Sequence, residues 1–201
     1  MDNIDILYQN IKITESVLEI ARILKPKKII NFSSIAVYPN KDGIYSELSE
    51  TRPSVNTECL YGLSKYCSEN LLDFFTRKEN VIISHLRVAQ VYGEGMREDR
   101  VISIMRNELR KNNTITVFGK GERTSNFIDI HKLLSIVEVF LTKDLPGIYN
   151  IGEKNMSYLD LARMLIKNYG NKNSKIIKKS SGLRVKFKLD TRKVEKLARL
   201  T

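Results

Sequence analysis

The sequence predicts an α/β fold, in which a parallel β-sheet is covered by helices. Stretches with apolar residues at helical spacing alternate along the chain with short apolar, β-branched stretches. The short stretches are almost continuously apolar, which is typical of parallel strands buried on both faces. The 201 residues show neither an internal repeat nor a clear interdomain linker, and they suffice for a packed core.

The first half of the chain contains two long helices and two strands. Residues 5–24 form an amphipathic helix that Pro26 ends, and residues 27–34 (KKIINFSS) form a buried strand. Residues 35–56 are rich in turn-forming residues and form a loop long enough to suggest a function. A helix over 57–77, a strand over 81–87 and a glycine-containing loop over 91–99 follow.

The second half continues the alternation. The expected elements are a helix at 100–111, a strand at 114–118, a loop at 119–125, a strand at 126–130, a helix at 131–142 and a strand at 147–152. Ser157 caps a helix that runs through residue 169, with Asp160 three residues later as in a capping box. Short strands near 175–187 and a helix from residue 191 complete the pattern.

Positive charge is concentrated at the end of the chain. Residues 171–201 hold eleven Lys and Arg against two acidic residues, which accounts for nine of the net charge of +11. Such a segment suits nucleic acid, a diphosphate or plain solvent. It has no aromatic interleaving beyond Phe187 and no zinc-finger or RNA-binding signature, so a nucleic-acid partner is not favoured.

The composition also limits the partners and the cellular compartment that can be expected. No apolar stretch reaches the ~20 residues that span a bilayer, and the first residues lack the features of a signal peptide. Cys59 and Cys67 are too few for a disulfide framework, and no cluster of metal-ligand type surrounds them. We therefore expect a cytoplasmic protein without a membrane partner or a metal.

Tyr61 and Lys65 are the first candidates for chemistry. Four residues apart on a helix, they share a face, and the ammonium would lower the pKa of the phenol from about 10 towards neutrality. A phenol of that kind is a usable general base for a sugar hydroxyl. The spacing alone is weak evidence, since Tyr8 and Lys12 match it equally well.

The strand that precedes Tyr61 and Lys65 favours this pair over Tyr8 and Lys12. It ends in Ser33 and Ser34, and the carboxyl ends of parallel strands border the crevice in which α/β sheets bind ligands. Ser34 would then hydrogen-bond the substrate oxygen that Tyr61 deprotonates. Alternatively, both serines merely finish the strand and Lys65 is solvated.

The motifs NFSSIAVY, YGLSKYCSE and LRVAQVYGEG, followed in order by VFGKGERTSNFIDI, GIYNIGEKNMSYLDLARML and KLDTRKVEKL, resemble the extended short-chain dehydrogenase/reductase family. The resemblance covers essentially the whole chain. It implies a Rossmann-like sheet with a smaller C-terminal substrate-binding α/β region, the cofactor NAD (NADP not excluded) and a nucleotide-sugar substrate. It also implies dimers formed through the helices at 5–24 and 57–77.

The resemblance assigns roles to individual residues. The catalytic residues would be Ser34, Tyr61 and Lys65, with Lys65 also on the nicotinamide ribose. The remaining cofactor contacts would be Ser33, Val88 and Ala89, and the remaining substrate contacts Gln90, Arg123, Phe127 and Lys179. Gln90 is equally well explained as a polar residue closing a strand.

Two departures from the family pattern bear on the substrate. The Asp-Glu pair of the family's 4,6-dehydratases is replaced by Ile35 and Ala36, which cannot transfer protons, so dehydration is disfavoured. The position of a common diphosphate-binding arginine holds Ser125, and Arg123 would serve instead, since its guanidinium suits phosphate. The position of the family's second phosphate-binding arginine falls near Lys179 and Ser180, and Lys179 would serve there, less directionally.

The glycine-rich turn of a dinucleotide site is not found. The first glycine is Gly43, and no G-x-G-x-x-G follows an early strand. We therefore expect residues 1–93 to be the remaining part of a dinucleotide-binding domain and 94–201 mainly the substrate region. Either the chain is truncated or a partner chain completes the sheet.

These observations predict an NAD-dependent nucleotide-sugar epimerase. The alternatives are an NAD(P)H-dependent keto-sugar reductase, which uses the same three residues in one direction, and a non-catalytic fragment or subunit.

Overall fold

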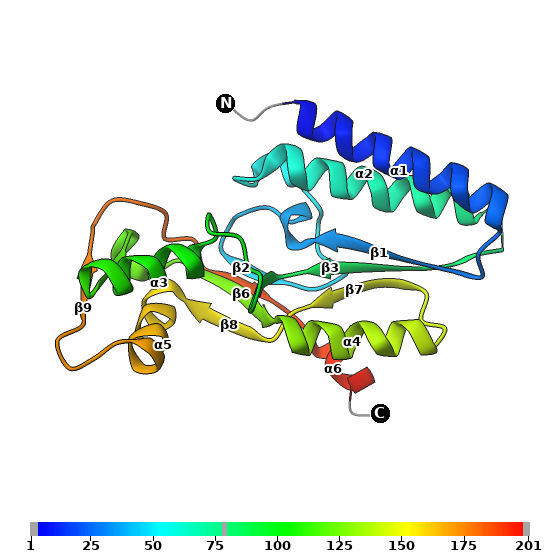
Figure 1. Ribbon diagram of the computed structural model, residues 1–201. Coiled ribbons are helices and arrows are strands. Elements are labelled where there is room, and N and C mark those ends of the chain that lie inside the picture. The colour runs from blue at the N-terminus through cyan, green and yellow to red at the C-terminus, as the bar shows by residue number, and fades with distance from the viewer. Residues whose placement is uncertain (1–3, 78–79, 199–201) are drawn as a thin grey trace.

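The computed structural model describes residues 4–77 and 80–198 and confirms the predicted α/β class (Figure 1). The helices are α1 (Asp5–Leu24), α2 (Cys59–Thr76), α3 (Val101–Asn112), α4 (Ile130–Thr142), α5 (Tyr158–Tyr169) and α6 (Arg192–Ala198). The strands are β1 (Lys28–Ser34), β2 (Gly43–Tyr45), β3 (Ile82–Val88), β4 (Gln90–Tyr92), β5 (Thr114–Val117), β6 (Thr124–Asp129), β7 (Gly147–Ile151), β8 (Lys154–Ser157), β9 (Lys175–Lys178) and β10 (Phe187–Leu189). Among these residues, no helix is both long and apolar enough to cross a membrane.

The main sheet has the strand order β1-β3-β7, and all three strands are parallel. Ser34 lies opposite Val88, and Val88 opposite Ile151, so the carboxyl ends of the three strands are in register. Helices α1 and α2 pack together on one side of the sheet, and α4 lies on the other (Figure 1). In the described part of the chain, β1 pairs with β3 on one side and with no strand on the other.

Three smaller sheets complete the fold. Strand β2 pairs with β10, β5 pairs with β9, and β4-β6-β8 form a three-stranded sheet in which β6 and β8 run antiparallel. The expected loop over 35–56 thus contains a strand, β2, together with two short 3₁₀ helices, Ile35–Val37 and Pro53–Val55. The antiparallel pair arises because β8 follows β7 after a tight turn and returns along β6.

Two apolar clusters hold these layers together. One lies around the main sheet and draws residues from both halves of the chain, for example Leu86 and Ile151, which are fully buried. The other lies between α3, β5 and α5 and includes Ile115 and Leu161. The predicted cap of α5 is confirmed, since the Ser157 hydroxyl accepts a hydrogen bond from the amide of Asp160.

Candidate active site

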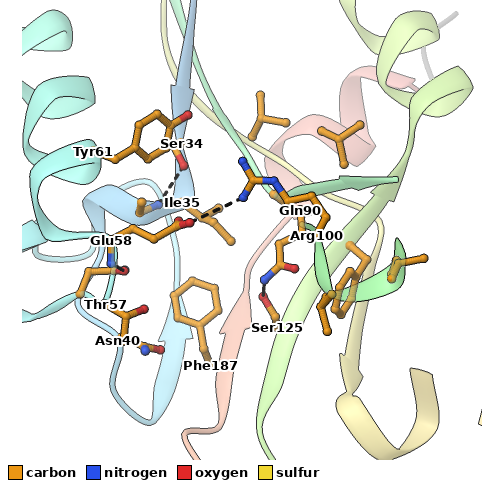
Figure 2. A pocket seen from close by; sticks show the side chains of 18 of the residues that line it. Ser34, Ile35, Asn40, Thr57, Glu58, Tyr61, Gln90, Arg100, Ser125 and Phe187 are labelled. Carbon is orange, nitrogen blue, oxygen red and sulfur yellow. Dashed lines mark hydrogen bonds and ion pairs between the residues drawn. The ribbon is translucent and has the colours of Figure 1, made fainter. Parts of the chain in front are cut away.

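A pocket of about 550 Å³ opens at the carboxyl ends of β1 and β3 (Figure 2). One wall comes from the segment after β1 and from the start of α2, and the other from β4, β6 and the start of α3. Among its lining residues are most of the predicted site residues, namely Ser33, Ser34, Tyr61, Lys65, Val88, Ala89, Gln90, Arg123 and Phe127.

Ser34 and Tyr61 meet at the centre of one wall. Ser34 ends β1 in an extended conformation, and its hydroxyl accepts a hydrogen bond from the amide of Ala36 at 3.1 Å. Tyr61 lies in the first turn of α2, with its phenol beside the Ser34 hydroxyl (Figure 2). Helix α2 packs closely against the segment that follows β1 at this point. Any larger residue at position 62 would prevent this packing, because a Cβ on Gly62 would lie 2.2 Å from the Ala36 carbonyl oxygen. Glycine at position 62 therefore brings the phenol to the tip of the strand.

Lys65 lies one turn further along α2 and faces the same pocket. Its ammonium donates a hydrogen bond to the Phe32 carbonyl oxygen at 2.9 Å and lies 5.7 Å from the centre of the Tyr61 ring. Burial lowers the pKa of Lys65. The predicted trio thus shares one pocket. Tyr8 and Lys12, which have the same spacing, lie on α1 and are not among the pocket-lining residues.

The expected acidification of Tyr61 by Lys65 was wrong for this arrangement. Burial raises the pKa of Tyr61, the nearby Glu58 carboxylate raises it further, and the hydrogen bond to Ser34 together with the charge of Arg100 lowers it only in part. The Lys65 ammonium is directed at the Phe32 carbonyl instead of the phenol oxygen. The cation predicted to favour the phenolate therefore contributes little to it here.

The apolar part of the pocket lies at the end of β3. Val88 and Ala89 are buried there, and both belong to the core of the main sheet. Gln90 begins β4, and its side-chain amide donates to the Ser125 hydroxyl at 3.0 Å across the sheet. Phe127 is buried on β6 and lies at the floor of the same pocket.

Arg123 also faces the pocket, and its Nε is buried without a hydrogen-bond partner among the described residues. The guanidinium lies over the Tyr158 ring, 5.2 Å from its centre. Buried donors in proteins are rarely unpaired, so the position suits an anionic ligand. Lys179 is placed elsewhere: it is exposed after β9, held by backbone hydrogen bonds to Val117 and Lys120, and is not among the pocket-lining residues.

A buried charge network behind the pocket was not anticipated from the sequence. Ser33 lines the pocket, but its hydroxyl donates to Glu69 at 2.5 Å. Glu69 in turn accepts two hydrogen bonds from Arg87, at 2.9 and 2.7 Å, and Arg87 donates a third to Tyr38. Tyr61, Lys65 and Glu69 follow each other at four-residue intervals, a spacing that could have placed Glu69 on the same helix face.

A second unanticipated pair crosses the pocket itself. Glu58, the residue before α2, and Arg100, the residue before α3, approach to 3.6 Å between carboxylate and guanidinium (Figure 2). Nothing in the spacing of these residues, 42 positions apart in the sequence, indicated the contact, because it depends on how the two helices start at opposite walls.

The parallel sheet, the serine at the tip of β1 and the Tyr-x-x-x-Lys motif facing it define the extended short-chain dehydrogenase/reductase class. The match to a family model is consistent with this assignment. The chain belongs to the NAD dependent epimerase/dehydratase family, whose model matches residues 1–152.

Relatives and solved structures of this class cover different activities. The chain is 26% identical over 175 residues to a dTDP-D-glucose 4,6-dehydratase from Dictyostelium discoideum, covering 79% of this chain and 40% of the relative. It is 32% identical over 130 residues to dTDP-4-dehydro-6-deoxyglucose reductase from Escherichia coli, covering 63% of this chain and 40% of the relative. The chain thus spans about two fifths of these curated relatives.

The fold is also similar to that of a UDP-glucuronic acid 4-epimerase from Bacillus cereus, solved in complex with UDP-glucuronic acid and NAD. The TM-score is 0.79 at 28% identity, and the match covers 96% of this chain and 62% of the epimerase. Nearly all of this chain therefore has a structural counterpart in the larger enzyme.

Proposed function

We propose that the chain forms the catalytic and sugar-binding part of an NAD-dependent nucleotide-sugar epimerase. The observation that carries the proposal is the convergence of Ser34, Tyr61 and Lys65 on one pocket whose far wall holds Arg123, with an Nε that has no hydrogen-bond partner in the described part of the chain. A sugar placed against the first three residues would direct its diphosphate towards Arg123.

Each residue has a separate task in the proposed reaction. Tyr61 removes the proton from a sugar hydroxyl, and Ser34 hydrogen-bonds the same oxygen and holds it in place. Lys65 binds the ribose of the cofactor next to Val88 and Ala89, which exclude water from that end of the pocket. The chemistry that NAD would supply, held at Lys65, Val88 and Ala89, is reversible hydride transfer at the sugar carbon.

The sugar-binding end favours epimerisation over dehydration. Ile35 and Ala36 line the pocket just after Ser34, and neither side chain can carry the second proton that loss of water requires. A keto-sugar reductase remains the second candidate, since the Escherichia coli relative has that name and the reduction uses the same three residues.

We further propose that the adenine half of NAD is held by polypeptide that pairs with the open edge of β1. That edge has no strand beside it in the described residues, and the match covers only 62% of the Bacillus cereus epimerase. In this proposal residues 1–93 belong to the dinucleotide-binding domain and 94–201 mainly bind the nucleotide-sugar substrate. Exposed apolar residues on α1, such as Ile13 and Ile20, support contact with a second copy or with a partner chain.

The test is cofactor binding with and without an added βαβ unit beside β1. We expect the 201-residue chain alone to bind NAD weakly or not at all by isothermal titration calorimetry. The chain fused behind a glycine-rich βαβ unit should bind NAD and convert a nucleotide sugar to its epimer, followed by NMR of the sugar. Tight, stoichiometric NAD binding by the 201-residue chain would contradict the proposed division, and a fused chain that binds NAD without sugar turnover would contradict the proposed activity.

A further inference from the structure

Three cationic side chains line the pocket, and the proposed function uses only two of them. Lys65 is hydrogen-bonded to the Phe32 carbonyl next to the cofactor position, and Arg123 lies over Tyr158 at the diphosphate end. Arg100 is the third. A guanidinium at the sugar end of such a pocket needs an explanation, because a neutral sugar does not require a full positive charge.

The contact that holds Arg100 is weak. Its guanidinium approaches the Glu58 carboxylate at 3.6 Å through a single nitrogen, and both side chains are 54% exposed. Exposed pairs with one long contact contribute little, because solvent screens them. By contrast, the neighbouring Asp99 already accepts two hydrogen bonds from Arg97, at 3.0 and 2.6 Å, and is not available to Arg100 in the same way.

The location of this pair is the reacting end of the pocket. Figure 2 shows Arg100 extending from the start of α3 across the pocket, opposite Ser34 and Tyr61, to reach Glu58. After burial, which is the largest influence on the phenol, the charges of Glu58 and Arg100 both act on Tyr61. The guanidinium is therefore within electrostatic range of the sugar atoms on which Tyr61 acts.

We infer that Arg100 is a specificity-determining residue that binds an acidic substituent on the sugar, so that the substrate is a nucleoside diphosphate sugar acid. The inference rests on the proposed function. Glu58 supplies a carboxylate to Arg100 when the pocket contains no substrate. A substrate carboxylate can form the bidentate pair with guanidinium that the Glu58 contact lacks, and it therefore displaces Glu58.

The test compares the binding of UDP, UDP-glucose and UDP-glucuronic acid to the 201-residue chain by calorimetry. We expect the acidic sugar nucleotide to bind about tenfold more tightly than the neutral one, since a charge-assisted bidentate pair is gained. Arg100→Met should remove this difference and leave the affinity for UDP unchanged. The matched control Arg163→Met, which alters an exposed arginine outside the pocket lining whose partner Asp160 also lies outside it, should keep the difference.

The variant Glu58→Gln should change the affinity for the acidic sugar nucleotide in the opposite direction. It removes the competing carboxylate, so UDP-glucuronic acid should bind a few-fold more tightly while UDP-glucose changes little. If UDP binds, two results would overturn the role of Arg100 without touching the proposed function. They are equal affinities for the two sugar nucleotides, and a difference in affinity that persists in Arg100→Met. Failure of all three ligands to bind would overturn the proposed nucleotide-sugar site as well.

Discussion

Replacement of Tyr61 by phenylalanine is expected to lower turnover of the NAD-binding fused chain by about a hundredfold to ten-thousandfold, the range of a lost general base. Phenylalanine keeps the ring that packs at the start of α2 and removes only the oxygen beside Ser34. The measurement is the rate of sugar conversion, with affinity for UDP measured in parallel. The affinity should stay the same, because Tyr61 acts on the sugar and Arg123 on the diphosphate.

The pH dependence separates this role from a structural one. Since the pKa of Tyr61 is raised, the phenolate is scarce at neutral pH, and the rate of the fused chain that retains Tyr61 should increase as the pH rises towards that pKa. The residual rate of the phenylalanine variant should lose this increase. Undiminished turnover in the variant, or the same rise with pH, would contradict the assignment of Tyr61 as the base.

Replacement of Glu69 by leucine is expected to destabilise the fold by about 3–5 kcal/mol, because it leaves a buried guanidinium without its partner. Arg87 and Glu69 are each only 3% exposed and share two hydrogen bonds. Burial alone lowers the pKa of Arg87, but the hydrogen bonds and charge of Glu69 raise it overall, so the arginine stays charged. Urea unfolding followed by circular dichroism measures the loss.

Two further variants make the test specific. Arg163→Met breaks an exposed ion pair with Asp160 and should cost about 0–1 kcal/mol. The double variant Glu69→Leu with Arg87→Met removes both buried charges, and it should recover much of the stability that Glu69→Leu loses. A loss below about 1 kcal/mol for Glu69→Leu would show that the network does not hold α2 against β1 and β3.

Long, strongly periodic elements were predictable from the sequence, and short strands were not. The helix over 5–24 and the strand ending at Ser34 appear where their apolar patterns place them. Strands β2 and β10 have three residues each and are separated by about 140 positions. Their pairing is decided by tertiary contacts such as the stacked rings of Tyr45 and Phe187, which no local pattern contains.

The candidate site was predictable as a set of residues but not in its electrostatics. A motif fixes which face of α2 carries Tyr61 and Lys65, so their convergence with Ser34 could be expected. The direction in which the Lys65 ammonium points depends on the Phe32 carbonyl, and the charge beside Tyr61 depends on Glu58 and its distant partner Arg100. Lys179 was assigned by its order in the sequence, and the backbone hydrogen bonds of its segment place it on the surface instead.

A crystal structure of the chain with UDP-glucuronic acid would show whether the sugar meets the Ser34 and Tyr61 side chains. We expect the diphosphate at Arg123 and a ring hydroxyl within about 3.2 Å of both the Tyr61 and Ser34 oxygens. A sugar nucleotide bound outside this pocket, or bound in it with every ring hydroxyl turned away from Tyr61, would contradict the claim that these residues form a catalytic site.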